Sequence, residues 1–220
     1  MYTTTQLLDL THTQARDYLA RFVFAWEALK ELKQFIYELG KSLPQEYEQI
    51  KEGVWVHTSA EIAPTACIQP PCIIGANTQV RHCAFIRGSA LIGNDCVVGN
   101  SVELKNVILF DNVQTPHYNY VGDSILGYKA HMGAGAITSN VKADKSNVVI
   151  KRGKIYQETG MKKVGAFLGD YAEVGCNSVL NPGTVLGRNC QIYPLSSVRG
   201  TVEENCIFKS PLEIVKKEEK

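Results

Sequence analysis

Apolar residues recur along this chain with two different periods, and the first of them is helical. Across residues 13–39 they are spaced as on one face of an α-helix, with charged residues between them. Thr11 and Gln14 have the spacing of a capping box, and Gly40 followed by Pro44 marks an end. The pattern predicts one amphipathic helix that packs on the protein's own core or on a neighbouring subunit. Its apolar face would consist of Leu19, Phe22, Trp26, Leu29, Leu32, Ile36 and Leu39.

After the helix the period changes to six. An aliphatic residue occupies every sixth position from Val56 to Leu104, followed by Phe110, and the same rhythm returns from Leu168 to Val198. A small or medium residue usually follows four positions after each aliphatic one, and Gly or Asn often lies next to it. The aliphatic positions are Val56, Ile62, Ile68, Ile74, Val80, Ile86, Ile92, Val98 and Leu104, then Leu168, Val174, Leu180, Leu186, Ile192 and Val198.

A period of six is typical of one short strand plus a tight turn, and three such units close a triangular coil. The aliphatic side chains then point inward, Gly and Asn adopt the turn conformations, and the coils stack at the strand spacing of about 4.8 Å. Cys72, Cys96 and Cys190 fall at the cramped corners, where they would act as small apolar fillers. The pattern therefore predicts an all-β fold, the hexapeptide-repeat left-handed parallel β-helix.

The two periods divide the chain into parts. Residues 1–53 are expected to form the N-terminal helical segment, and residues 54–208 the left-handed β-helix domain. Residues 142–163 are polar and basic and lack aliphatic anchors, so they are expected to form an extruded loop with a short hairpin around residues 148–156. The charged tail, residues 209–220, is expected to leave the β-helix as a short helix.

Composition narrows the choice of partners and compartment. The 220 residues include 23 Lys plus Arg and 22 Asp plus Glu, a net charge of +1, which argues against nucleic acid as a partner. The seven cysteines form no C-x-x-C pair and no zinc-type spacing with histidine, so neither a disulfide framework nor a metal is expected. The first ten residues lack the basic and apolar parts of a signal peptide, and no apolar run reaches the ~18 residues of a membrane helix. We therefore expect a cytoplasmic protein without membrane contact.

Three of the five histidines lie within the coil region. His82, His117 and His131 are separated by 35 and 14 residues, whereas His12 and His57 fall at element boundaries. Since an unperturbed imidazole has a pKa of ~6.5, each of the three is a candidate acid, base or metal ligand.

Three blocks of sequence resemble a known family. They are residues 99–106 (GNSVELKN), 116–123 (PHYNYVGD) and 132–140 (MGAGAITSN). With the spacing between them, they resemble the acetyltransferase half of the bifunctional N-acetylglucosamine-1-phosphate uridyltransferase/glucosamine-1-phosphate acetyltransferases, over residues 62–202. Residues 180–187 (LNPGTVLG) also resemble short stand-alone relatives of sugar-phosphate nucleotidyltransferases. The glycine-rich nucleotide loop of the uridyltransferase half has no counterpart in the chain.

The resemblance implies a role for each matching residue. His117 would be the general base that removes a proton from the sugar amine as the amine attacks the acetyl thioester. Arg87, Lys105 and Tyr120 would hold the sugar phosphate, for which two cations and a phenol are suited. Asn140 matches a substrate-binding Asn, and His131 stands where the family carries a second one, so both are candidate substrate contacts. Ala134, Cys176 and Pro194 would contact acetyl-CoA, with the backbone around Ala134 near the acetyl carbonyl.

Three functional hypotheses follow. The first is a homotrimeric, acetyl-CoA-dependent N-acetyltransferase acting on an amino-sugar phosphate such as glucosamine 1-phosphate, in UDP-N-acetylglucosamine biosynthesis. The second is a non-catalytic β-helix module that binds a sugar nucleotide or a separately encoded nucleotidyltransferase. The third is a metal site like that of γ-class carbonic anhydrases, with His82, His117 and His131 as ligands. The first is the interpretation that we adopt.

Overall fold

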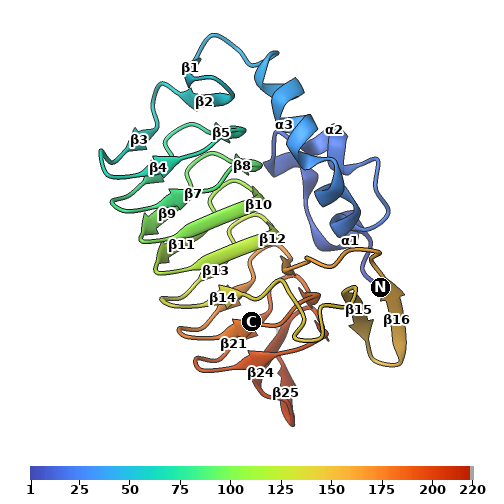
Figure 1. The fold of residues 1–220 in the computed structure, drawn as a ribbon. Helices are drawn as coiled ribbons and strands as arrows, with labels where there is room; N and C mark the ends of the chain where they lie inside the picture. The colour runs from blue at the N-terminus through green and yellow to red at the C-terminus, as the bar shows by residue number, and fades with distance from the viewer. Residues whose placement is uncertain (219–220) are drawn as a thin grey trace.

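The six-residue repeats form short parallel strands that wind into a three-sided prism (Figure 1). A computed structural model describes residues 1–218 of the chain. Successive coils pair at an offset of 18 residues, as between Ile74 and Ile92 or Val80 and Val98. The aliphatic anchors therefore stack in columns inside the prism, where all are buried except Ile62, which is partly buried. The predicted left-handed parallel β-helix is confirmed.

The strands lie on three faces, which we name by their surroundings. The helix-covered face holds β2 (Val54–His57), β5 (Cys72–Ile74), β8 (Ala90–Ile92), β17 (Ala166–Leu168), β20 (Thr184–Leu186) and β23 (Thr201–Val202). The site face holds β4 (Cys67–Ile68), β7 (Phe85–Ile86), β14 (Ile137–Thr138), β19 (Val179–Leu180) and β22 (Ser197–Val198). The long strands β10 (Glu103–Leu109) and β12 (Tyr120–Leu126) pass from the site face to the helix-covered face.

The third face and the two ends complete the prism. The third face holds β3 (Glu61–Ile62), β6 (Gln79–Val80), β9 (Val97–Asn100), β11 (Gln114–His117), β13 (His131–Met132), β18 (Glu173–Val174), β21 (Gln191–Ile192) and β24 (Cys206–Ser210). At the ends, β1 (Tyr47–Lys51) and β25 (Glu213–Lys216) pair antiparallel with β2 and β24. The tail predicted to be helical thus forms a strand, because β24 offers it an open edge to pair with. Residues 219–220 lie outside the described residues.

Some coils are one residue shorter than the repeat. Leu104 pairs with Val121 at an offset of 17, and Leu109 rather than Phe110 lies beside Ile92. The prediction of Phe110 as an anchor is therefore wrong by one position, since its N–H bonds the Leu126 carbonyl in the turn that follows the strand. Phe110 is nevertheless fully buried.

The N-terminal segment is broken into short helices instead of the single helix predicted. They are α1 (Thr4–Leu7), η1 (Leu10–His12), α2 (Arg16–Leu19), η2 (Ala25–Lys30) and α3 (Leu32–Gly40). The chain leaves the helical conformation at Phe24, and the Val23 carbonyl accepts a hydrogen bond from the Thr4 N–H. Aromatic and β-branched residues have low helix propensity, so this tertiary pairing overrides the periodic pattern. The capping box lies at Thr3 and Gln6 rather than at the predicted pair, whereas the predicted end at Gly40 is confirmed.

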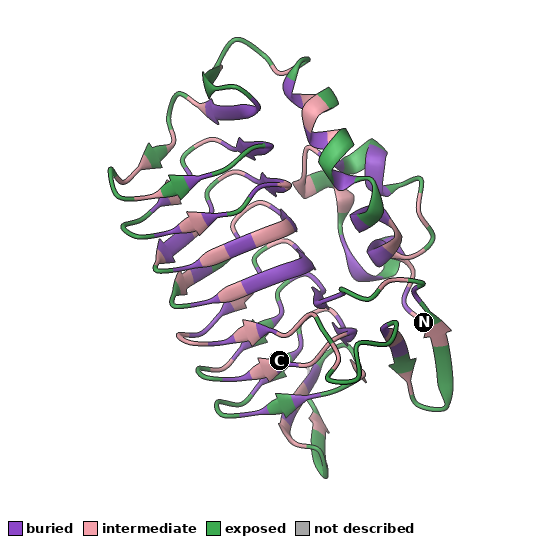
Figure 2. Cartoon of the chain, in the orientation of Figure 1, coloured by how far each residue is buried: buried purple, intermediate pink, exposed green. Residues whose placement is uncertain are grey.

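These short helices cover one face of the prism (Figure 2). The covering explains why the strands of that face are apolar on both sides. Strands on this face carry apolar residues at consecutive positions, and their outward side chains are as buried as the inward ones. The outward row consists of Ile73, Leu91, Ile108, Ile125, Phe167 and Val185. A covered sheet needs apolar residues on both sides, so the row is a sequence signal for the covered face.

The extruded segment forms the predicted hairpin, with strands β15 (Val149–Arg152) and β16 (Ile155–Glu158). β15 contacts β20 and β23 of the last coils. The predicted corner cysteines Cys72, Cys96 and Cys190 are also confirmed as buried. Burial raises the pKa of the Cys72 thiol to about 12, so this side chain stays protonated and unreactive.

Replacing Phe167 by Ala is expected to lower the free energy of unfolding by roughly 3–5 kcal/mol. Its ring is fully buried and lies 5.9 Å from Trp26 between ring centroids, so its loss leaves a cavity between the helices and the prism. Chemical denaturation followed by tryptophan fluorescence measures this. Leu195→Ala is the control, because Leu195 is 80% exposed and should be neutral. Equal effects of both substitutions would contradict the packing.

Candidate functional site

The predicted catalytic residue and the predicted CoA contacts, which come from different parts of the sequence, lie in one column. The column follows the corner of the prism between the third face and the site face. His117, Ala134 and Cys176 each precede a residue that turns the corner with positive φ. The N–H of Gly135 donates to the His117 carbonyl (3.0 Å). In the next coils, the N–H of Asn177 donates to the Ala134 carbonyl and the N–H of Leu195 to the Cys176 carbonyl (2.8 and 2.9 Å). We call this column, with His82, Asn100, His117, Ala134, Cys176 and Pro194, the His117 corner.

A buried amide fixes the corner at His117. The Asn119 side chain accepts a hydrogen bond from the His117 N–H (3.1 Å) and donates to the carbonyls of Gly133 and Ala136 (2.8 and 3.0 Å). Asn119 is 2% exposed, whereas the imidazole of His117 faces solvent. Two neighbouring coils are thereby held together beneath an exposed imidazole. Asn119 is not among the predicted site residues, although an Asn at a corner position that elsewhere holds small residues is a usable signal.

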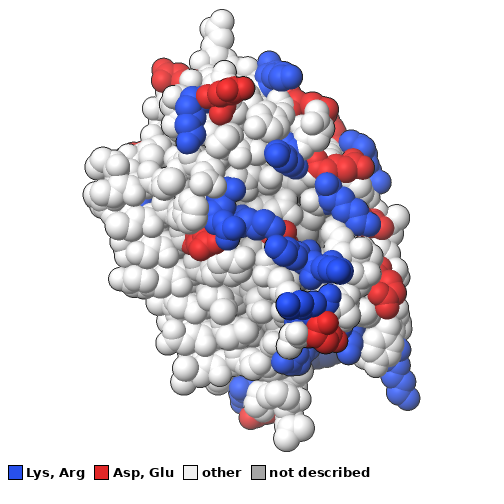
Figure 3. Space-filling view, in the orientation of Figure 1, with Lys and Arg blue, Asp and Glu red and all other residues white. Residues whose placement is uncertain are grey.

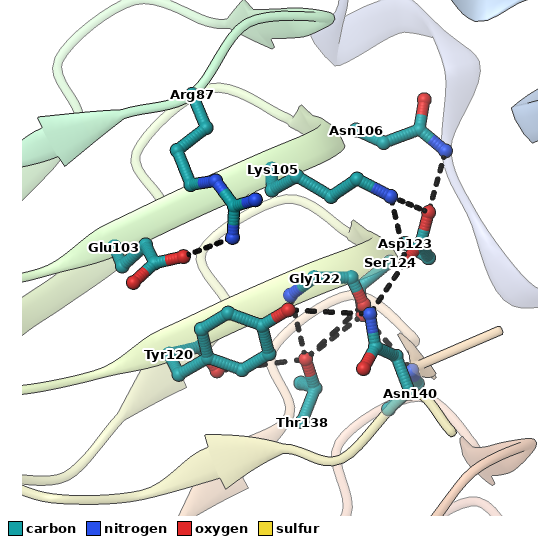
Figure 4. Close-up of polar contacts among 11 residues, drawn as sticks. Arg87, Glu103, Lys105, Asn106, Tyr120, Gly122, Asp123, Ser124, Thr138 and Asn140 are labelled. Carbon is teal, nitrogen blue, oxygen red and sulfur yellow. Dashed lines mark hydrogen bonds and ion pairs between the residues drawn. The ribbon is translucent and has the colours of Figure 1, made fainter. Parts of the chain in front are cut away.

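A second cluster surrounds Asp123 at the other edge of the site face (Figure 4). The Lys105 ammonium lies 2.8 Å from Asp123 Oδ1 and 3.1 Å from Oδ2. The amides of Asn106 and Asn140 donate to the same carboxylate (2.9 and 2.6 Å), and the Asn140 amide also donates to the Tyr120 hydroxyl (3.2 Å). Only 3% of Asp123 is exposed. We call these five residues the Asp123 network.

The two cations assigned to a phosphate are each paired with a carboxylate. Arg87 Nη1 lies 2.7 Å from Glu103 Oε1, on the strand next to β7, as Lys105 pairs with Asp123. A bound phosphate must therefore compete with these carboxylates. Burial and the nearby Asp123 charge raise the pKa of Tyr120, so its phenol stays protonated and able to donate. Figure 3 shows Lys and Arg gathered in a band on this side of the molecule.

The two clusters are joined by a short stretch of chain that runs from the end of β11 into β12. Tyr120 begins β12 three residues after His117 ends β11, and Asp123 follows three residues later. Three extended residues span about 10 Å. The exposed imidazole and the Asp123 network are therefore close enough to contact one small molecule along the site face.

His131 lies elsewhere within the protomer. It is on the third face, in register with Gln114 and Glu173, and its Nδ1 is 2.9 Å from Glu173 Oε2. The structure does not bring it to the Asp123 network. His82 lies two coils from His117, about 10 Å away at the strand spacing, and its Nδ1 contacts Thr65. The three histidines do not converge within one protomer, and residues 1–218 contain no cluster of His, Cys, Asp and Glu suited to a metal ion.

A polar clamp attaches the extruded hairpin to both ends of the chain. The Arg152 guanidinium donates to both carboxylate oxygens of Glu203 (2.8 and 2.7 Å), and the Tyr2 hydroxyl donates to Glu203 Oε2 (2.7 Å). The guanidinium also lies 4.1 Å from the centre of the Tyr2 ring. The hairpin is thus fixed to the N-terminal segment and to the last coil.

This clamp predicts a pH-dependent difference in stability. Hydrogen bonds from Arg152 lower the pKa of Glu203 below its ordinary 4.5, so the carboxylate stabilises the fold above that pH and less as pH falls through the lowered value. Glu203→Gln should be less stable than the wild type by about 1 kcal/mol at pH 7, because the pair is partly exposed. Thermal unfolding from pH 7 to pH 3 should show the difference shrink as the pH falls. Glu48→Gln, at an exposed position on β1, is the control; a difference independent of pH would contradict the assignment.

The chain is similar in sequence to bifunctional nucleotidyltransferase/acetyltransferase proteins. No family model matches the chain. The chain is 34% identical over 137 residues to the bifunctional protein GlmU of Methanococcus maripaludis, which is 61% of this chain and 33% of that protein. It is 30% identical over 162 residues to a bifunctional sugar-1-phosphate nucleotidylyltransferase/acetyltransferase of Sulfurisphaera tokodaii, which is 73% of this chain and 40% of that protein.

Among solved structures, a hexapeptide transferase family protein from Anaplasma phagocytophilum superposes with a TM-score of 0.43 at 16% identity, covering 76% of this chain and 81% of that chain. No helix among residues 1–218 is long and apolar enough to cross a membrane. The chain spans about a third of the length of the first of these curated relatives. Over the matched region, this left-handed β-helix resembles the acetyltransferase domain of the bifunctional GlmU proteins.

Proposed function

We propose that this protein is an acetyl-CoA-dependent N-acetyltransferase that acts on an amino-sugar phosphate, with glucosamine 1-phosphate as the first substrate to test. The observation that carries the proposal is the His117 corner. It stacks the exposed imidazole and the three positions assigned to CoA, Ala134, Cys176 and Pro194, in one column. The similarity to bifunctional nucleotidyltransferase/acetyltransferases supports the same activity.

In the proposed reaction the substrate amine attacks the thioester carbonyl while His117 accepts a proton from the amine. The resulting tetrahedral oxyanion collapses, the C–S bond breaks, and the CoA thiolate leaves and takes up a proton. The N–H groups of Gly133 and Gly135 already donate to the carbonyls of Val174 and His117. No acceptor for the Ala134 N–H lies among residues 1–218, so this N–H is our candidate donor to the oxyanion.

The Asp123 network has a positioning role in this proposal. The substrate phosphate would bind beside Lys105 and Arg87, with Tyr120 donating a hydrogen bond. Because the buried Asp123 carboxylate forms an ion pair with Lys105, the ammonium is oriented before the substrate binds. We further propose a homotrimer in which a neighbouring protomer completes the site face. In this arrangement His131 of the neighbouring copy would contact the substrate.

The activity test uses purified protein, acetyl-CoA and a panel of amino-sugar phosphates. We expect release of free CoA with glucosamine 1-phosphate and an acetylated product by mass spectrometry. N-acetylglucosamine 1-phosphate is the matched control, because its nitrogen is already acylated and it should release no CoA. Absence of CoA release across the panel would refute the proposal. Light scattering that gives a monomer mass would refute the trimer.

A further inference from the structure

A cavity of about 760 Å³ lies between the extruded hairpin and the site face. This volume falls in the range of roughly 300–1,000 Å³ that is typical of small-molecule sites. Ser139 and Val141 line the cavity, and they flank Asn140 of the Asp123 network. A ligand that begins at the Asp123 network can therefore continue into this cavity.

The cavity keeps cationic side chains that no carboxylate neutralises. Lys151 and Arg199 line it, and among the described residues neither has an acidic partner within ion-pair distance. Lys142, which also lines it, is paired with Asp144 (3.4 Å). Arg87 and Lys105 differ from Lys151 and Arg199 in this respect, because each of them is held by a carboxylate. The cavity therefore holds two cations without an ion-pair partner among the described residues, together with the carboxylates of Asp144 and Glu158.

The other lining side chains match the remaining parts of a nucleotide. The Tyr156 ring is 62% exposed, and the Lys151 ammonium lies 5.4 Å from its centre, so one face of a base can stack there beside a cation. Glu158 lines the same cavity, and a carboxylate readily accepts hydrogen bonds from ribose hydroxyls. Arg199 presents a guanidinium of the kind that binds phosphate oxygens in pairs.

We propose that this cavity binds the nucleoside diphosphate part of the acceptor, so that the substrate is a nucleotide-linked amino sugar. The inference rests on the proposed acetyltransferase function and specifies its acceptor class. The sugar and its first phosphate would lie beside the Asp123 network, as in the proposed function, with the second phosphate at Arg199 and Lys151 and the base against Tyr156. The nucleotide of CoA is a different source of the same chemistry. CoA is assigned to the His117 corner, at the opposite edge of the site face, so we do not expect its nucleotide to occupy this cavity.

Calorimetric titration of the full chain with UDP, dTDP and GDP tests the site directly. We expect at least one nucleoside diphosphate to bind, and Arg199→Gln and Lys151→Gln each to weaken that binding about tenfold or more. Lys154→Gln is the matched control, because Lys154 lies in the turn of the same hairpin but does not line the cavity. CoA affinity should be unchanged in all three variants.

The outcomes separate this inference from the proposed function. If glucosamine 1-phosphate is acetylated but no nucleoside diphosphate binds or inhibits, the inference is wrong while the acetyltransferase proposal stands. If nucleoside diphosphates bind as expected but neither free nor nucleotide-linked amino sugars are acetylated, the site stands and the activity is refuted. Loss of CoA affinity, rather than nucleotide affinity, in Arg199→Gln would assign the cavity to CoA and overturn the inference. A higher kcat/KM for glucosamine 1-phosphate than for its nucleotide-linked form would also overturn it.

Discussion

Replacing His117 by Ala is expected to lower kcat/KM for acetyl transfer by about 10²–10⁴-fold, the usual contribution of a general base. The imidazole is exposed, and its corner is held by the backbone and by Asn119, so the fold of the His117 corner does not depend on the side chain. Steady-state kinetics measured by CoA release, with CoA affinity measured by calorimetry, separate these effects. The loss should appear mainly in kcat, because the substituted group acts during proton transfer.

The matched control is His82→Ala. His82 lies in the same corner, two coils from His117, and contacts Thr65. It should keep wild-type kinetics. Equal kinetics for the two Ala variants would contradict the role of His117.

Replacing Asp123 by Ala is expected to lower the free energy of unfolding by roughly 3 kcal/mol. The substitution removes the acceptor of the Lys105 ammonium and of two side-chain amides, and leaves that cation without a partner at a mostly buried position. Ala also resists the backbone conformation here, since Asp123 has φ +49°. Urea denaturation measures the loss.

Two control variants show which part of this loss is electrostatic. Asp123→Asn keeps the size of the side chain and tolerates the positive φ, so it should lose less stability than the Ala variant while still raising KM for the sugar phosphate. Asp144→Ala removes an exposed carboxylate paired with Lys142, and it should unfold like the wild type. If Asp123→Ala and Asp144→Ala had the same unfolding midpoint, the Asp123 network would not be a stabilising element.

The resemblance to a known family, rather than any local pattern, predicted the residues of the candidate site. The resemblance of three short blocks named His117, Lys105, Tyr120 and Asn140, and the structure places the last three together around one carboxylate. It did not indicate that Lys105 and Arg87 are already paired. Asp123 lies within a matched block, but its part in the network depends on contacts between coils. Such contacts join residues 16 to 20 positions apart, so they depend on where each coil turns.

The sequence alone determined the β-helix, because each repeat of six residues encodes its own strand, turn and inward side chain, and neighbouring repeats do the same. It also determined the extruded hairpin, since the anchors stop between residues 142 and 163. Tertiary structure alone decided that the N-terminal segment breaks into short helices over one face, and that Arg152 joins Glu203 and Tyr2. These features bring together residues 51 to 201 positions apart. No local period encodes such a separation, so only the folded prism fixes which side chains meet.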